Sequence, residues 1–323
     1  MNISNEVPTN KVVTITLNPA LDLTGSLQQL TIGSVNLVNK GSLHPAGKGV
    51  NVAKVLSDLG ADVTVTGFLG KENDTLFRQL FLNMRAKDKF IRVEGSTRIN
   101  VKLVEDNGDV SDINFPGISI SEQEIKDFED NLFKLANTHQ FFVLAGSLPP
   151  GISPSLCASW IEKLHQRGKK VLFDSSHSAL SAGIEAHPWL IKPNDDELSD
   201  FIGTPLKTIA ECRQVAEKIA TKGIDNIVVS LGAKGVMWLR KAANGLPFWQ
   251  YSQPPKLQVV STVGAGDTLV AGFCWGSMQN WQAEQTLSFS TALSALAVSQ
   301  VGVGVPCLPS VIKLQKEIIL SNT

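Results

Sequence analysis

An acidic side chain directly follows a glycine-rich turn near the C-terminal end of the chain. In the stretch STVGAGDTLVAGF, Asp267 stands after Gly264, Ala265 and Gly266, between a strand-like LQVV and a helix-permissive apolar run. The free amides at such a helix start attract phosphate. An anion bound there would lie beside the Asp267 carboxylate, which could orient and deprotonate a hydroxyl that attacks phosphorus. The pattern therefore indicates a phosphoryl-transfer site, where positioning and charge neutralisation do most of the catalysis.

A second glycine-flanked motif, PAGKGVN, offers a cation and an amide. It is not a phosphate-binding P-loop, because the first glycine is missing and Gly49 stands where Ser or Thr would bind magnesium. A helix start with Gly47 and Lys48, and Asn51 one turn in, presents backbone N–H groups, an ammonium and an amide. Those groups suit a polyhydroxy ligand. An ordinary helix cap would explain the motif equally well.

The stretch TRINVKL has the alternation of a strand. A period of two puts Arg98, Asn100 and Lys102 on one face and the apolar residues on the other. Two cations and an amide in a row could hold a phosphate. The solvated face of an antiparallel strand would have the same pattern.

The motif KPNDDE follows an apolar, strand-like run. Asn194 and Glu197 lie three residues apart on an opening helical turn. Their oxygens suit Mg²⁺, which keeps several waters and usually takes only one or two groups from protein. A plain helix cap by Asn194 is the alternative.

The motif SLGAKG lies between two β runs. Gly232 and Gly235 can turn the chain there, while Ser230 and Lys234 offer polar contacts to a ligand. A hairpin turn without any binding role explains the motif almost as well.

The composition restricts the class of protein. The chain has 323 residues, 43% hydrophobic and 18% charged, enough for a large buried core. A formal net charge of −1 gives no general attraction to nucleic acid or to a membrane, so we expect neither as a partner. Four cysteines lack metal-ligand spacing, the start MNISNEVPTNK lacks an apolar leader, and no membrane-length apolar stretch occurs. These features favour a cytoplasmic protein that acts on small molecules.

Apolar runs and amphipathic segments alternate along the chain. Helix-start signals such as Ser121 with Glu124, and Ser153 with Pro154, mark several of the amphipathic segments. This order predicts an α/β protein with a doubly wound, mainly parallel sheet. The expected strands, several of them apolar on both faces, are 11–18, 61–70, 141–148, 169–176, 188–194 and 226–239.

Two turn-rich stretches interrupt this order. LDLTGSLQQLTIGSVNLVNKGSLH and STRINVKLVEDNGDVSDINF alternate without intervening helices. We expect them to form a small antiparallel β-sheet from roughly 20–44 and 95–116, attached to the main sheet and able to act as a lid. No repeat or long linker occurs, so residues 1–323 are expected to form a single domain.

Seven short motifs occur in the order known from one family. TLNPALD, PAGKGVNVAKVLSDLG, TRINVKL, AGSLPPG, KPNDDE, SLGAKG and GAGD resemble the motifs of the PfkB, or ribokinase-like, family of sugar kinases. The resemblance runs from about Lys11 to the C-terminal region. It implies a ribokinase-like fold with a β-sheet lid, ATP as co-substrate, Mg²⁺ as cofactor and, as in many members, a homodimer formed through the lid.

Within the family the motifs are most similar to those of members that phosphorylate fructose 1-phosphate at its 6-hydroxyl to give fructose 1,6-bisphosphate. Ser261 supports this branch, because ribokinase-type members usually have an acid there, whereas Ala46 replaces a glycine of many members. Kinases of tagatose 6-phosphate or fructose 6-phosphate, and a catalytically silent sugar-phosphate sensor, stay open as alternatives. A dinucleotide-dependent oxidoreductase is disfavoured, since no G-x-G-x-x-G opens a helix after a strand.

The resemblance also implies roles for individual residues. Asp267 would be the general base, with an anion hole formed by the amides of Gly264, Ala265 and Gly266. The residues around the sugar and its phosphate would be Asp22, Gly47, Lys48, Asn51, Arg98, Asn100, Lys102 and Ser147. Those serving the ATP phosphates and Mg²⁺ would be Lys192, Asn194 and Glu197, with the metal held through water. Those lining the nucleotide site would be Ser230, Gly232, Lys234 and Gly235.

Overall fold

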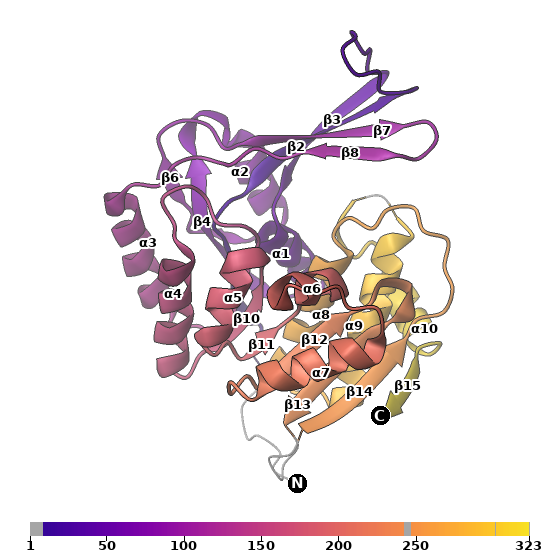
Figure 1. The fold of residues 1–323 in the computed structure, drawn as a ribbon. Helices are drawn as coiled ribbons and strands as arrows, with labels where there is room; N and C mark the ends of the chain where they lie inside the picture. Colours follow the sequence, from indigo (N-terminus) through magenta and orange to yellow (C-terminus); the bar gives the residue numbers. More distant parts are fainter. Residues whose placement is uncertain (1–8, 242–246, 301, 323) are drawn as a thin grey trace.

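A large, mostly parallel sheet forms the centre of the protein in the computed structural model, which describes residues 9–241, 247–300 and 302–322 (Figure 1). The polar start of the chain, residues 1–8, lies outside these ranges. The sheet has 11 strands in the described chain. They are β1 (Lys11–Thr16), β4 (Asp62–Gly70), β5 (Lys87–Asp88), β6 (Ile91–Val93), β9 (Phe141–Ala145), β10 (Lys170–Asp174), β11 (Leu190–Ile191), β12 (Asn226–Ser230), β13 (Val236–Lys241), β14 (Pro247–Gln253) and β15 (Ile319–Asn322).

The strand order is β15-β14-β13-β12-β11-β10-β9-β1-β4-β5, with β6 paired to β4. Pairings from β12 through β11, β10, β9 and β1 to β4 are parallel, and those from β12 to β15 are antiparallel. The doubly wound, mainly parallel sheet predicted from the apolar runs is confirmed. One expected strand is wrong: residues 257–260 form a loop whose valines are exposed, because no neighbouring strand pairs with them.

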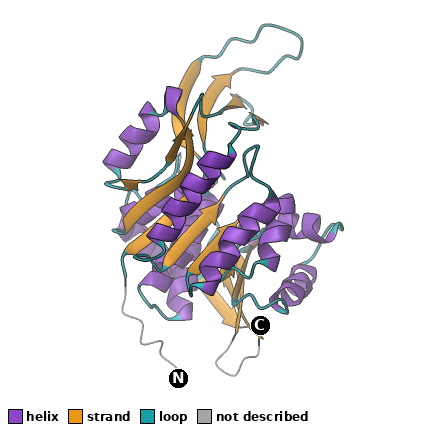
Figure 2. Cartoon of the chain, turned by 90° about the vertical axis from the view of Figure 1, so that its left-hand side faces the viewer, coloured by secondary structure: helices purple, strands orange, loops and turns teal. Residues whose placement is uncertain are grey.

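Helices cover both faces of this sheet, as the side view shows (Figure 2). Adjacent residues of β1 point to opposite faces. Val13 belongs to the buried apolar cluster that includes residues of α3 to α7, and Val12 to the cluster that includes residues of α1, α2 and α8. The helices are α1 (Lys48–Asp58), α2 (Thr75–Asn83), α3 (Glu122–Leu135), α4 (Pro154–Gln166), α5 (His177–Glu185), α6 (Asp195–Ile202), α7 (Ile209–Ala220), α8 (Ala265–Met278), α9 (Ala283–Val298) and α10 (Leu308–Gln315). Short 3₁₀ helices are η1 (Lys71–Asn73) and η2 (Gly232–Lys234). No helix in the described ranges has the length and apolar composition needed to cross a membrane.

Local signals in the sequence explain where several helices begin. The Ser121 side chain accepts a hydrogen bond from the Glu124 amide, and the Glu124 side chain accepts one in return, so the predicted capping box is present. Ser153 caps α4 ahead of Pro154, also as predicted.

A second, small sheet projects from the large one at the top of Figure 1. Its strands, in spatial order, are β3 (Lys40–Ala46), β2 (Ala20–Leu27), β7 (Ile99–Glu105) and β8 (Val110–Ile113). The two outer pairings are antiparallel, as expected for this sheet, whereas the central pairing of β2 with β7 is parallel. Ala46 ends β3 opposite Ala20 and is not among the residues with positive φ, so alanine fits there without strain.

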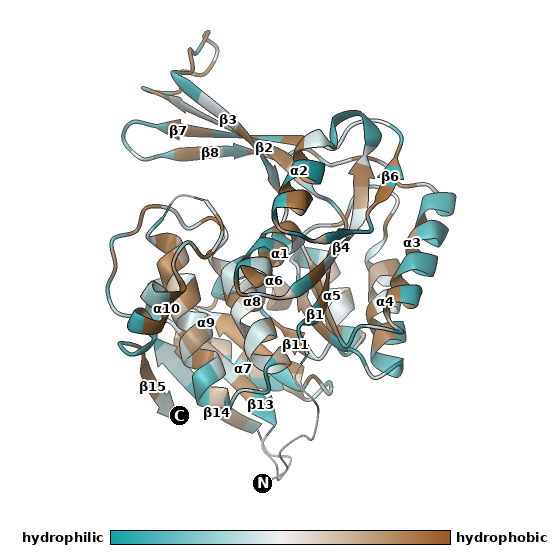
Figure 3. Cartoon of the chain, turned by 180° about the vertical axis from the view of Figure 1, so that it is seen from behind, coloured by the Kyte–Doolittle hydropathy of each residue, from teal (hydrophilic) through white to brown (hydrophobic). Residues whose placement is uncertain are grey.

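The small sheet has one polar and one apolar face, as the alternation predicted. Asp22 lies opposite Asn100, and Lys102 lies opposite Asp112. The apolar face contains one aligned row across all four strands. Its members are Leu43, Leu23, Val101 and Ile113. Three of them are exposed by 37 to 50%, and Figure 3 shows hydrophobic stretches on β7 and β8.

Candidate functional site

The glycine-rich turn lies at the start of α8, next to Asp267. Gly264 caps the helix with a φ of 78°, and a Cβ at this position would lie 2.4 Å from Cγ2 of Val303. Glycine is therefore required there, both for conformation and for space. The Ala265 amide donates to the Thr262 carbonyl at 3.3 Å, whereas the Gly266 amide makes no hydrogen bond within the described chain. An anion at this helix start thus has at least one free donor from the predicted anion hole.

Asp267 is buried and held by an amide from another part of the chain. Its Oδ2 accepts a hydrogen bond of 2.7 Å from Nδ2 of Asn51, which lies one turn into α1. Burial, followed by the negative charge of Asp174, raises the pKa of Asp267 to about 6, against the lowering effect of the Asn51 hydrogen bond. A carboxylate with a pKa near the working pH can both accept and release a proton.

Two lysines share one buried carboxylate beside Asp267. Oδ1 of Asp174 lies 3.3 Å from Nζ of Lys48 and 3.5 Å from Nζ of Lys192. The other oxygen, Oδ2, is buried and has no hydrogen-bond partner among the residues that the structure describes. Sequence reasoning missed Asp174, although an acid at the end of the buried strand VLFD, where ligands of parallel sheets bind, was a usable signal.

The lysines and carboxylates of this cluster stabilise one another's charged forms. Lys192 is only 4% exposed, and its Nζ lies 3.5 Å from where a Cβ on Gly266 would be, so this cation lies against the start of α8. Burial disfavours the charge of Lys48, but the carboxylates of Asp174 and Glu197 outweigh it and raise the pKa of this lysine. A buried cation beside free helix amides is an arrangement that binds a phosphate.

Asp22, Asn100 and Lys102 lie together on the polar face of the small sheet. Nδ2 of Asn100 donates to Oδ1 of Asp22 at 3.2 Å, and Lys102 forms an ion pair of 3.3 Å with Asp112. Burial raises the pKa of Asp22, although the Asn100 hydrogen bond lowers it in part. The face therefore has both donors and acceptors for hydroxyl groups.

Arg98 stands where the small sheet meets the large one. Its guanidinium donates to the carbonyls of Asn18 at 2.8 Å and Phe115 at 2.7 Å, and its Nη2 lies 3.4 Å from Oγ of Ser147. Burial lowers the pKa of Arg98, and no carboxylate forms an ion pair with it within the described residues. This cation is therefore fixed in direction while its charge remains available to an anionic ligand.

Asn18 is a site residue that the motif reading did not single out. Its Nδ2 donates to Oγ of Ser147 at 3.2 Å and to the carbonyl of Pro116 at 3.0 Å. It thereby connects the end of β1, the end of β9 and the segment that follows β8. The motif TLNPALD contains Asn18 as well as Asp22, so the sequence does carry a signal for this residue.

Asn194 and Glu197 form the capping box of α6. The Glu197 amide donates to Oδ1 of Asn194 at 2.6 Å, and the Asn194 amide donates to Oε2 of Glu197 at 3.0 Å. Oε1 of Glu197 remains on the side of Lys48, at 3.7 Å from its Nζ. No group of three His, Cys, Asp or Glu side chains in the described ranges could hold a metal ion. A hydrated ion that takes a single protein oxygen, such as Oε1 of Glu197, would fit the donors present.

Ser230, Gly232, Lys234 and Gly235 occupy the connection between β12 and β13. These strands are antiparallel and η2 lies between them, so the chain makes a hairpin turn here. Ser230 forms a parallel bridge with Asn194, which places this turn beside the start of α6.

Apart from the four residues of the β12–β13 turn, the predicted residues thus form two groups. The first gathers at the ends of the parallel strands and the starts of α1 and α8, and it gains Asp174. Its members are Gly47, Lys48, Asn51, Lys192, Asn194, Glu197, Gly264, Ala265, Gly266 and Asp267. The second lies on the small sheet and at its base, with Ser147 and Asn18.

Comparisons with known proteins give one consistent result. The family described as pfkB family carbohydrate kinase matches residues 11–311. The chain is 62% identical to the 1-phosphofructokinase of Vibrio cholerae over 97% of either chain, and 42% identical to that of Escherichia coli K12 over 96% of this chain and 98% of the other. Its fold matches that of Escherichia coli phosphofructokinase-2 in complex with substrates and products, with a TM-score of 0.84, 25% identity, and coverage of 95% and 99%.

Proposed function

The chain belongs to the pfkB family of carbohydrate kinases, and on that basis we propose that it transfers the γ-phosphoryl group of ATP to the 6-hydroxyl of fructose 1-phosphate. The family inferred from the seven motifs is thereby confirmed. The observation that carries the proposal is the placement of Asp267: a buried carboxylate, held by Asn51, at a helix start against which the Lys192 ammonium lies.

In this proposal Asp267 acts as the general base. Its ionised carboxylate accepts the proton of the 6-hydroxyl while that oxygen forms a bond to the γ-phosphorus. The bond from the γ-phosphorus to the bridging oxygen breaks, and ADP leaves with the electron pair. Lys192 and the free amide of Gly266 neutralise charge on the transferring group, and Asn51 keeps the base in place.

Magnesium would accompany ATP and neutralise part of the phosphate charge. Glu197 would hold the hydrated ion through its Oε1. The turn formed by Ser230, Gly232, Lys234 and Gly235 would bind the nucleotide, because it lies beside the start of α6.

The phosphorylated end of the sugar would lie on the side of Arg98. Arg98 and Lys102 share the polar face of the small sheet, and Arg98 has no carboxylate partner among the described residues. A neutral sugar would leave that cation unpaired beneath a closed lid, which is unfavourable. Asp22 and Asn100, already hydrogen-bonded to each other, would contact the sugar hydroxyls.

We also propose that the small sheet is a lid and that two copies pair through its apolar face. Four aligned apolar residues cross the sheet, and the adjoining loop exposes Ile32, Val35 and Leu37 by 81 to 94%. An apolar surface of this kind marks an interaction site. Since ATP and sugar phosphates are intracellular metabolites, we place the enzyme in the cytoplasm.

Product analysis tests the proposed function. Protein incubated with Mg-ATP and fructose 1-phosphate should give one ADP per sugar, and phosphorus NMR should find phosphate esters on C1 and C6. Phosphorylation at another carbon, or no phosphorylation of this sugar, would overturn the proposal.

A further inference from the structure

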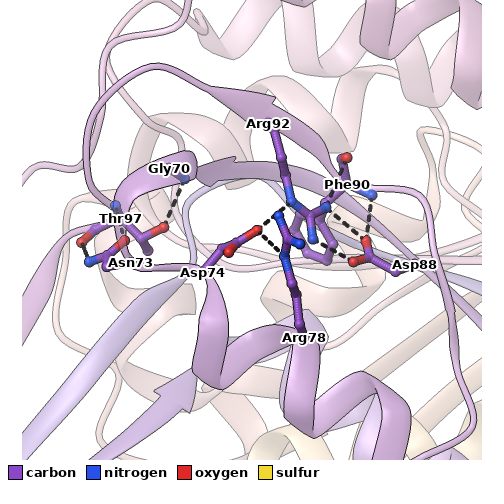
Figure 4. A network of polar contacts seen from close by, with 8 residues as sticks. All are labelled: Gly70, Asn73, Asp74, Arg78, Asp88, Phe90, Arg92 and Thr97. Atoms are coloured by element: carbon purple, nitrogen blue, oxygen red, sulfur yellow. Dashed lines mark hydrogen bonds and ion pairs between the residues drawn. The ribbon is translucent and has the colours of Figure 1, made fainter.

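A half-buried asparagine outside the motifs holds the chain where it enters the small sheet. Nδ2 of Asn73 donates to the Thr97 carbonyl at 2.8 Å, and its Oδ1 accepts from the Thr97 amide at 2.8 Å (Figure 4). One side-chain amide thus satisfies both backbone groups of a residue 24 positions away, as a neighbouring strand would. Thr97 is only 3% exposed, so these groups have little access to water.

The remaining contacts of Thr97 leave its backbone little room to move. Its Oγ1 accepts from the Gly70 amide at 2.9 Å, and a Cβ on Gly70 would lie 2.3 Å from the Thr97 nitrogen. The end of β4 therefore approaches Thr97 as closely as glycine allows. Two further contacts, from Lys71 to Glu94 and from Ser96 to Glu72, lie at the exposed side, where water screens them, so they contribute little to holding Thr97.

An ion-pair network supports Asn73 from the other side. Oδ2 of Asp74 accepts from Nε of Arg78 at 2.7 Å and from Nε of Arg92 at 2.9 Å, and Arg92 also forms two bonds to Asp88 (Figure 4). Although burial opposes ionisation, the two arginine hydrogen bonds hold the pKa of Asp74 below its ordinary value. The residue after Asn73 is thus anchored between α2 and β6.

Arg98 and Asn100 follow Thr97 directly. The Arg98 carbonyl accepts from the Leu21 amide at 2.9 Å, which begins the pairing of β7 with β2, and Asn100 then lies opposite Asp22. A rotation or shift at Thr97 would move the Arg98 guanidinium and the Asn100 amide together, because they lie one and three residues further along the same strand.

We propose that Asn73 is a positioning residue that sets the place of Arg98 and Asn100 and thereby the enzyme's affinity for the phosphorylated sugar. The inference rests on the proposed function, since it assumes that Arg98 contacts the sugar phosphate. Asn73 itself touches no substrate and acts through the backbone of Thr97.

Kinetics of three variants and a double-mutant cycle test this. Asn73→Ala should raise KM for fructose 1-phosphate by about tenfold, the effect of losing about 1.4 kcal/mol, and leave KM for ATP unchanged. Asn73→Asp, which can accept from the Thr97 amide but turns a carboxylate oxygen toward the Thr97 carbonyl, should raise KM for fructose 1-phosphate at least as much as Asn73→Ala. Lys71→Ala, in the same turn but not bonded to Thr97, is the matched control and should change neither constant.

The double-mutant cycle of Asn73 and Arg98 distinguishes a positioning effect on KM from a general loss of stability. Because part of its effect runs through Arg98 and part through Asn100, adding Asn73→Ala to Arg98→Ala should raise KM for the sugar phosphate by a smaller factor than Asn73→Ala does alone. Full additivity of the two changes, or an equal rise of both KM values, would overturn the inference.

Amide hydrogen exchange tests the same inference without turnover. Asn73→Ala should speed exchange at residues 98–103, and Lys71→Ala should not. Unchanged exchange there would overturn the positioning role. If the wild-type protein fails to phosphorylate fructose 1-phosphate, the proposed function fails, and the exchange result still decides whether Asn73 orders the strand.

Discussion

Nδ2 of Asn51 lies 2.7 Å from Oδ2 of Asp267, across 216 positions of the sequence. This hydrogen bond joins the start of α1 to the start of α8, the two glycine-bounded helix starts that the sequence singled out separately. It orients one oxygen of the buried carboxylate and leaves the other without a hydrogen bond to the described residues.

Replacing Asp267 should slow phosphoryl transfer without weakening the binding of either substrate. In Asp267→Ala, kcat should fall by about 10² or more, the range for loss of a positioned acid–base group, while the dissociation constants of ATP and fructose 1-phosphate change little. Steady-state kinetics and calorimetric titration of each ligand measure the two effects. Asn51→Ala should be compared with it. This variant removes the hydrogen bond to the Asp267 carboxylate but keeps the carboxylate itself, so it should reduce kcat less than Asp267→Ala does. Near wild-type turnover in Asp267→Ala would remove Asp267 from the role of base.

Activity should fall as the pH is lowered below about 6. The pKa of Asp267 is raised to about 6, so the carboxylate becomes protonated as the pH falls through that value and can no longer accept the hydroxyl proton. Bound phosphates add negative charge and shift the midpoint upward. Because a phosphate ester also titrates near pH 6, the quantity to measure is kcat with both substrates saturating. A kcat that stays level down to pH 5 would be incompatible with this role.

The arginine at the base of the small sheet should affect one substrate selectively. Arg98→Ala should raise KM for fructose 1-phosphate by about 10- to 150-fold, corresponding to about 1.5–3 kcal/mol for a charge-assisted contact, with a much smaller change for ATP. The structural bonds of Arg98 to the Asn18 and Phe115 carbonyls are lost as well. An equal effect on both substrates would therefore point to folding of the lid instead of phosphate binding.

A charged side chain on the apolar face of the small sheet should dissociate the proposed dimer. Ile113 is half exposed within the aligned apolar row, and Ile113→Asp should shift the mass found by analytical ultracentrifugation from that of a dimer to that of a monomer. Ile312→Asp is the control, because Ile312 is similarly exposed but lies on α10 of the large domain. A monomeric wild-type protein, or dissociation caused equally by both variants, would contradict pairing through the lid.

Features that depend on neighbouring residues were predictable from the sequence. The capping box of Ser121 and Glu124 and the alternation that separates Lys102 from Val101 each arise within a few residues. The parallel pairing of β2 with β7 was not predictable, because it joins distant segments. The loop 257–260 has strand-like residues but no partner strand, so its local preference was overridden.

The site was predictable in its residue types but not in its contacts. Asp267 and Lys48 were identified from their motifs, whereas Asp174 matters only because folding brings two lysines to one of its oxygens. Asn73 carries no motif signal at all, since its importance comes from the backbone of Thr97. Long-range contacts of this kind cannot be read from local spacing.

The most direct test of the account is the comparison of kcat/KM for fructose 1-phosphate, fructose 6-phosphate, tagatose 6-phosphate and fructose in one coupled assay of ADP release with Mg-ATP. We predict that fructose 1-phosphate has the highest value and unphosphorylated fructose the lowest, because Arg98, which forms no ion pair with a carboxylate of the described residues, offers a cation to the existing phosphate. A higher value for either 6-phosphate would contradict the assignment of substrate, and no ADP release with any sugar would contradict the assignment of this protein as an active kinase.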